Sequence, residues 1–103
     1  MPSIEDLQKL IADAPDDAFL NYALAQELAK AGRPEEAIAA YDRVIGIDPH
    51  YHYAYFHKAR VLEDEGRIDD AVAALGAGLR LAQADQEPKA AGELQGYLDT
   101  LSP

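Results

Sequence analysis

Three histidines in one short segment are the residues with the clearest potential for metal chemistry. His50, His52 and His57 follow one another at intervals of two and five residues. Two imidazoles share one helical face when they stand four residues apart, and no pair here has that spacing. A helix that begins near His52 would point the three side chains in different directions. The sequence therefore predicts no metal site and no cofactor, and it leaves His57 as a candidate ligand contact that titrates near neutral pH.

The other residue types give little support to an enzyme. The chain has no cysteine, and its few hydroxyl side chains, Ser3, Thr100 and Ser102, lie near the chain ends. No Ser or Thr is therefore available as a nucleophile on a rigid interior scaffold. Carboxylates are plentiful, but no pattern places a pair of them in an apolar pocket that would separate their pKa values. We expect no catalytic residues.

The charge balance restricts the class of partner. The 103 residues include 9 Lys and Arg against 19 Asp and Glu, a formal net charge of −10. Nucleic acids and anionic membranes both attract basic proteins, so the sequence predicts neither as a partner. No apolar run is long enough to span a membrane, and no secretory leader is visible, which favours a cytoplasmic location. The acidity has a second interpretation as an adaptation to a salty cytoplasm.

The chain repeats itself at an interval of 34 residues. A shift by that interval aligns Ala25 with Ala59 and Gly32 with Gly66, and it aligns apolar residues at many further positions. Each period contains two amphipathic segments that are separated by a glycine, which indicates pairs of helices. The expected helices span about 3–13, 17–31, 34–47, 52–65, 68–82 and 88–101.

At these positions the chain resembles the tetratricopeptide repeat family. The residues that carry the resemblance are Leu24, Ala25, Leu28, Ala37, Tyr41 and Pro49, followed by Tyr55, Ala59, Leu62, Ala71 and Leu75, whereas Asn21 stands where the family usually has an aromatic residue. The resemblance implies an all-α fold, a right-handed α-solenoid of antiparallel helix hairpins with about six helices. We expect one domain over 1–103, made of a half repeat (3–15), repeat one (16–49), repeat two (50–83) and a C-terminal capping helix (86–101).

The resemblance also implies where a partner binds. In this family the first helix of each repeat lines a concave groove that holds a peptide. The groove stripe of the two first helices predicts eight binding residues: Phe19, Tyr22, Gln26, Lys30, Tyr53, Phe56, His57 and Arg60. Aromatic side chains are typical binding anchors. The alternative is that the terminal helices fold over these aromatics.

Two further features bear on the partner's chemistry. Some members of the family hold a C-terminal carboxylate with Lys and Asn residues, but the only Asn here, Asn21, stands at a packing position. Lys30, His57 and Arg60 remain as a weaker carboxylate-binding hypothesis. The acidic run 63–65 is interpreted either as a solvated edge or as a lip that selects a basic segment.

These observations predict a protein–protein interaction module with an adaptor or scaffold role. The expected partner is a peptide or an extended segment of another protein. The alternative is self-association, in which two copies pair through the face of the N-terminal helix whose hairpin partner is missing, giving a homodimer.

Overall fold

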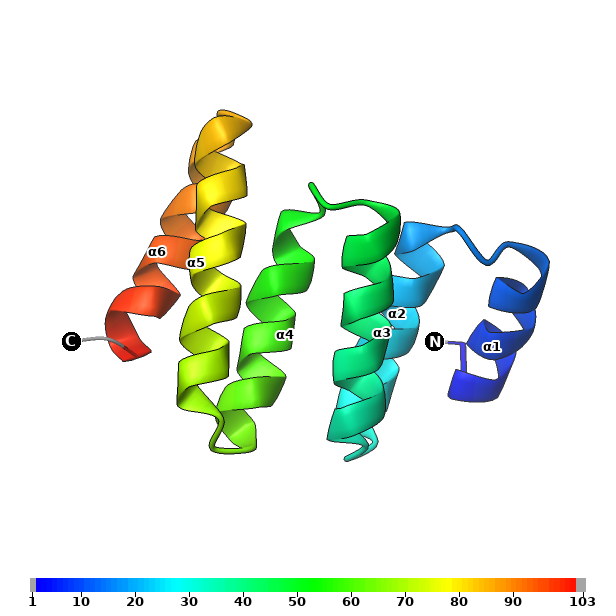
Figure 1. Cartoon of the computed structure of the whole chain (residues 1–103). Coiled ribbons are helices and arrows are strands. Elements are labelled where there is room, and N and C mark those ends of the chain that lie inside the picture. The colour runs from blue at the N-terminus through cyan, green and yellow to red at the C-terminus, as the bar shows by residue number, and fades with distance from the viewer. Residues whose placement is uncertain (1, 102–103) are drawn as a thin grey trace. The chain divides into compact units, whose positions relative to one another are not determined.

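The computed structural model describes residues 2–101, which form six helices joined by short turns and contain no strand (Figure 1). The helices are α1 (Ile4–Asp13), α2 (Ala18–Lys30), α3 (Pro34–Ile47), α4 (His52–Asp64), α5 (Ile68–Ala84) and α6 (Pro88–Leu101). Each observed helix end lies within two residues of its predicted position. The all-α prediction is confirmed.

The helices gather into two compact units, which meet in the sequence between Pro49 and His50. In the first unit, α2 packs against both α1 and α3; in the second, α5 packs against both α4 and α6. The border between the units coincides with the predicted border between the two repeats. The finer division into a half repeat, two repeats and a capping helix stays a prediction.

Local side chains determine where the first two helices begin. The Ser3 hydroxyl accepts a hydrogen bond from the Asp6 backbone N–H at 3.0 Å, and the Asp6 carboxylate accepts one from the Ser3 backbone N–H. This reciprocal pair is a capping box, which satisfies two of the backbone donors left open at a helix start. The Asp17 carboxylate caps α2 in the same way, by accepting from the Leu20 N–H at 3.0 Å. Both predicted starts are confirmed.

Three helix ends share one turn geometry with a residue at positive φ. Gly32 follows α2 with φ of 72°, and Gly66 follows α4 with φ of 76°. Glycine is favoured there because it has no side chain to clash in the left-handed conformation. Gln86 takes the same place after α5, with φ of 57°. The α5–α6 turn therefore uses a strained non-glycine residue to reverse the chain.

Small residues allow the helices of each hairpin to approach closely. The four alanines at equivalent repeat positions, Ala25, Ala37, Ala59 and Ala71, are fully buried. Large apolar side chains fill the remaining interior of each unit, and those of the first unit include Leu24, Leu28, Tyr41 and Val44, whereas those of the second include Leu62, Leu75 and Leu94. This apolar core is the interior that the repeat pattern predicts.

Asn21 is the exception in this interior, because it is polar and only 1% exposed. Its side-chain amide donates to the backbone carbonyls of Asp17 at 2.9 Å and Pro15 at 3.3 Å. The amide thus ties the start of α2 to the preceding turn. The predicted packing role of Asn21 is confirmed.

Gly78 marks the closest approach in the second unit. A Cβ atom at this position would lie 2.7 Å from Tyr55 Cβ on α4 and 3.3 Å from Leu94 Cδ2 on α6. Those distances are too short for any larger residue without movement of a neighbouring helix. The missing side chain of Gly78 therefore lets α5 contact both of its neighbours.

Candidate functional site

The four predicted binding residues of α2 differ widely in exposure. Phe19 is 66% exposed and Lys30 is exposed, whereas Tyr22 and Gln26 are partly buried. The Tyr22 ring packs edge-on against the Tyr41 ring of α3, with 6.0 Å between the ring centroids. Tyr22 therefore supports the fold of the first unit as well as presenting one edge of its ring.

Phe19 and Gln26 lie on a hollow between α1 and α2. The hollow has a volume of about 240 Å³ and is lined by Pro2, Leu7, Leu10, Phe19, Leu20, Ala23, Gln26 and Glu27. We call this surface the α1–α2 face. Leu10, from α1, is 49% exposed beside it. The predicted binding residues do not include Leu10, because the 34-residue period aligns it with the buried Val44.

Lys30 stands close to this face and is paired. Its Nζ lies 3.2 Å from Glu27 Oε2, and the Glu27 side chain is mostly buried at 19% exposure. Because the Lys30 side chain is 66% exposed, water screens the pair and it contributes little to stability. The pair instead places one positive and one negative group at the edge of an apolar hollow.

The predicted residues of α4 define a surface that we call the α4 face: Tyr53, Phe56, His57 and Arg60. The Phe56 ring is the centre of this group, because the His57 ring packs edge-on against it at 5.3 Å and the Arg60 guanidinium lies 5.4 Å from its centroid. A guanidinium over a ring is held by the ring's electron-rich face. The structure thus brings together three of the four residues.

The terminal helix α6 covers part of the α4 face. The Tyr97 ring lies 5.1 Å from the Phe56 ring, and the Tyr97 hydroxyl donates to Glu63 Oε1 on α4. Burial, followed by this carboxylate, raises the pKa of Tyr97 above its ordinary value. Phe56 is only partly exposed as a result. In this unit a terminal helix therefore lies over one of the predicted binding aromatics, which is the arrangement given above as the alternative to an open binding groove.

Two residues of the α4 face have shifted pKa values. Burial, and secondarily the nearby Glu93 carboxylate of α6, raises the pKa of Tyr53. Burial lowers the pKa of His57, and the Arg60 charge lowers it further. His57 is therefore neutral over more of the physiological pH range than a free imidazole. A neutral imidazole offers one donor and one acceptor to a ligand.

His50 and His52 do not diverge as the spacing suggested. Both side chains meet the Asp85 carboxylate at the α5–α6 turn, with His50 Nδ1 at 2.7 Å and His52 Nε2 at 2.6 Å from Asp85 Oδ2. The expectation of different directions was wrong for this pair because His50 lies before the first residue of α4. Its side chain does not follow the helical period. His57, further along α4, packs against Phe56 instead.

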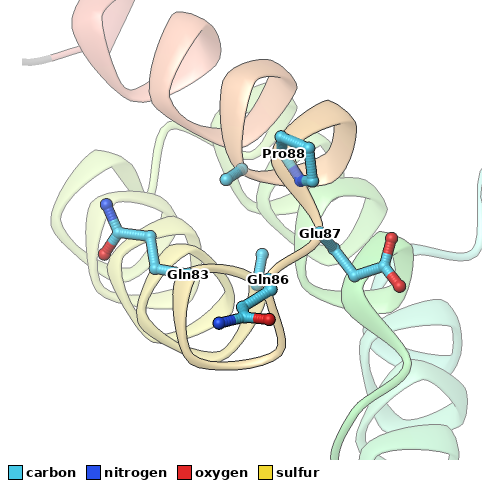
Figure 2. Close-up of a pocket in the computed structure, with 6 residues that line it drawn as sticks. Gln83, Gln86, Glu87 and Pro88 are labelled. Carbon is cyan, nitrogen blue, oxygen red and sulfur yellow. The ribbon is translucent and has the colours of Figure 1, made fainter.

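The α5–α6 turn that carries Asp85 also has a hollow of its own. The hollow has a volume of about 410 Å³. Figure 2 shows Gln83, Gln86, Glu87 and Pro88 around it, and Ala82 and Ala91 complete its lining. Its rim is polar and exposed, which is typical of a solvated turn. Among residues 2–101, no helix combines the length and the apolar content needed to cross a lipid bilayer.

Comparisons with known proteins agree with this architecture. Two tetratricopeptide repeat family models match the chain, over residues 28–92 and 3–52. The solution structure of a tetratricopeptide repeat domain protein from Salinibacter ruber is 32% identical, with a TM-score of 0.80 over 85% of this chain and 89% of that one. A comparison with curated proteins found no significant match.

Two further solved structures contain a bound partner. The TPR2B domain of yeast Sti1, solved in a complex with pHsp70, is 26% identical with a TM-score of 0.88 over 96% of this chain and 79% of that one. PcrH, solved with the chaperone binding region of PopD, has the same TM-score at 21% identity, over 96% and 75% of the two chains. The repeat period, the six helices and these matches together show that the chain belongs to the tetratricopeptide repeat family.

Proposed function

We propose that the chain is a protein-interaction module that binds an extended segment of a partner protein and has no catalytic role. The observation that carries this proposal is the α1–α2 face, where Phe19 and Leu10 stand 66% and 49% exposed beside an apolar hollow. Large apolar side chains that gather on a surface are typical of binding sites. The family membership and the yeast relative solved with pHsp70 support the same class of function.

Phe19 is the proposed anchor of the α1–α2 face. Covering a phenylalanine ring contributes about 1.5–3 kcal/mol, so this one contact accounts for a tenfold to hundredfold change in affinity. Gln26, in the same hollow, supplies an amide that donates and accepts hydrogen bonds to a peptide backbone. The partner segment is therefore expected to insert an apolar side chain beside Phe19, with its backbone near Gln26.

Charged groups near the α1–α2 face are proposed to favour partner segments of a particular charge. Glu27 lines the hollow and Lys30 pairs with it at the edge. The net charge of −10 steers basic segments toward the protein. On the α4 face, the Phe56 ring is partly covered by Tyr97, so it offers a partner less apolar surface than Phe19 does. We propose that the exposed Arg60 and the neighbouring His57 orient a partner there through polar contacts. A cytoplasmic adaptor or scaffold role belongs to the same proposal.

The test is a selection from a random-peptide display library with the whole chain as bait, followed by affinity measurements on the selected peptides by fluorescence anisotropy. Phe19→Ala is expected to weaken binding at least tenfold. Ile68→Ala is the matched control, because Ile68 is another large apolar residue at 37% exposure and lies on α5. If the two variants bind equally well, Phe19 is not the anchor and the α1–α2 face is not the site.

Self-association is the second candidate function, and the exposed Leu10 on α1 favours it. Two copies would cover this residue by pairing through their α1 helices around a twofold axis. Sedimentation velocity at two concentrations distinguishes the candidates. A concentration-dependent dimer that Leu10→Glu abolishes would establish self-association, whereas a monomer at both concentrations would exclude it.

A further inference from the structure

Two turns of the second unit bring three potential metal ligands together. His50 precedes α4, His52 is its first residue, and Asp85 follows the last residue of α5. The ligand atoms of the three side chains all lie within 4.8 Å of one another. His50 and His52 are 35 and 33 residues distant from Asp85 in the sequence. The fold alone is responsible for this convergence.

The three side chains offer the donor atoms that zinc prefers. Two imidazole nitrogens and one carboxylate oxygen are a ligand set that binds Zn²⁺ with a fourth position left for water. Zinc–nitrogen bonds of about 2.0–2.1 Å in a tetrahedron place ligand atoms roughly 3.3 Å apart. The observed separations of 2.7 and 2.6 Å from Asp85 are hydrogen-bond lengths. Small side-chain rotations would be needed to lengthen them, and the His50 side chain is 58% exposed.

The electrostatic surroundings favour a cation at this place. The Asp85 carboxylate supplies a negative charge that both imidazoles contact. Asp85 also stands at the C-terminal end of α5, where the open carbonyl groups concentrate partial negative charge. The chain's net charge of −10 adds a general attraction for cations.

We propose that His50, His52 and Asp85 form a zinc-binding site, with one further position open to water. The ion would join the segment before α4 to the α5–α6 turn and so stabilise the second unit. None of its three residues belongs to either proposed partner-binding face.

The chain's third histidine makes the test internally controlled. Isothermal titration of the whole protein with zinc chloride is expected to show one ion per chain. His52→Ala and Asp85→Asn should each weaken binding at least tenfold, and His57→Ala should leave it unchanged. Circular dichroism of each variant verifies that it is folded.

Proton NMR supplies a second measurement that needs no variant. Zinc should shift the imidazole signals of His50 and His52 and leave those of His57 in place, and millimolar Mg²⁺ should shift none of them, because magnesium prefers oxygen ligands. Zinc affinity that persists in the His52→Ala/Asp85→Asn double variant would overturn the proposal. So would imidazole signals that zinc does not move.

Discussion

Replacing Gly78 by alanine should destabilise the second unit, because an added methyl group meets two neighbouring helices at once. The new Cβ would lie 2.7 Å from Tyr55 Cβ, 3.1 Å from Tyr55 Cγ and 3.3 Å from Leu94 Cδ2. Tyr55 Cβ is attached directly to the α4 backbone, so a rotamer change cannot move it away. The helices themselves must separate.

The size of the effect follows from two opposing contributions. Overpacking of a core by one methyl group typically costs about 1–3 kcal/mol. Alanine in place of glycine within a helix contributes about 1 kcal/mol in the favourable direction. Because the shortest contact here is close to the backbone, we expect the upper part of the overpacking range. The net loss in unfolding free energy is then about 1–2 kcal/mol.

Gly92 provides the matched control for this substitution. It lies within α6, it is exposed, and a Cβ added there would meet no atom within 4 Å. Gly92→Ala should therefore raise stability by about 0.5–1 kcal/mol. Urea denaturation followed by circular dichroism measures both variants. If Gly78→Ala is as stable as Gly92→Ala, α5 does not pack against its neighbours as closely as these distances require.

Three further predictions concern single side chains. Asn21→Ala should cost about 1–3 kcal/mol, because it removes the two hydrogen bonds that the buried amide donates to the Asp17 and Pro15 carbonyls; denaturation measures it. Asp17→Ala should cost about 1 kcal/mol by removing the cap of α2, whereas the neighbouring Asp16→Ala serves as the comparison and should cost less. Because the pKa of His57 is lowered by burial and by Arg60, the folded chain binds fewer protons there than the unfolded chain near pH 6. The stability that neutral His57 contributes to the folded chain is therefore fully present above about pH 6.5 and is lost as the pH falls through the pKa of His57 in the folded chain. An NMR titration of His57 with a midpoint at or above 6.5 would contradict this.

The helices could be predicted from the sequence because nearby residues determine where each helix begins and ends. Asp17 caps the start of α2 and Gly32 allows the turn after its end, so both effects depend on nearby residues only. The 34-residue period showed which apolar helix faces pack against another helix. The contacts of α6 were harder to predict, because they depend on which face meets α5. Leu94 and Ala90 turn out to be buried, whereas Gln95 is exposed.

The features that no local pattern showed are contacts between distant residues. From the sequence alone, Gly78 appears only as a residue of low helix propensity. The structure shows that the missing side chain lets α5 pack closely against Tyr55. His50 and His52 meet Asp85 across two turns, which no spacing along one helix could reveal. The covering of Phe56 by Tyr97 is of the same kind. It changes which variants are suitable probes, since truncating a half-covered ring disturbs the fold as well as the surface.

The proposal that a partner binds the α1–α2 face is tested most directly by NMR of the isotope-labelled chain with a selected peptide. We predict that chemical-shift changes concentrate on Leu10, Phe19, Ala23 and Gln26. We also predict that they become much smaller in Phe19→Ala at the same peptide concentration, in line with the expected loss of affinity of at least tenfold. Shift changes confined to α5 and α6, with the α1–α2 face unaffected, would contradict the account.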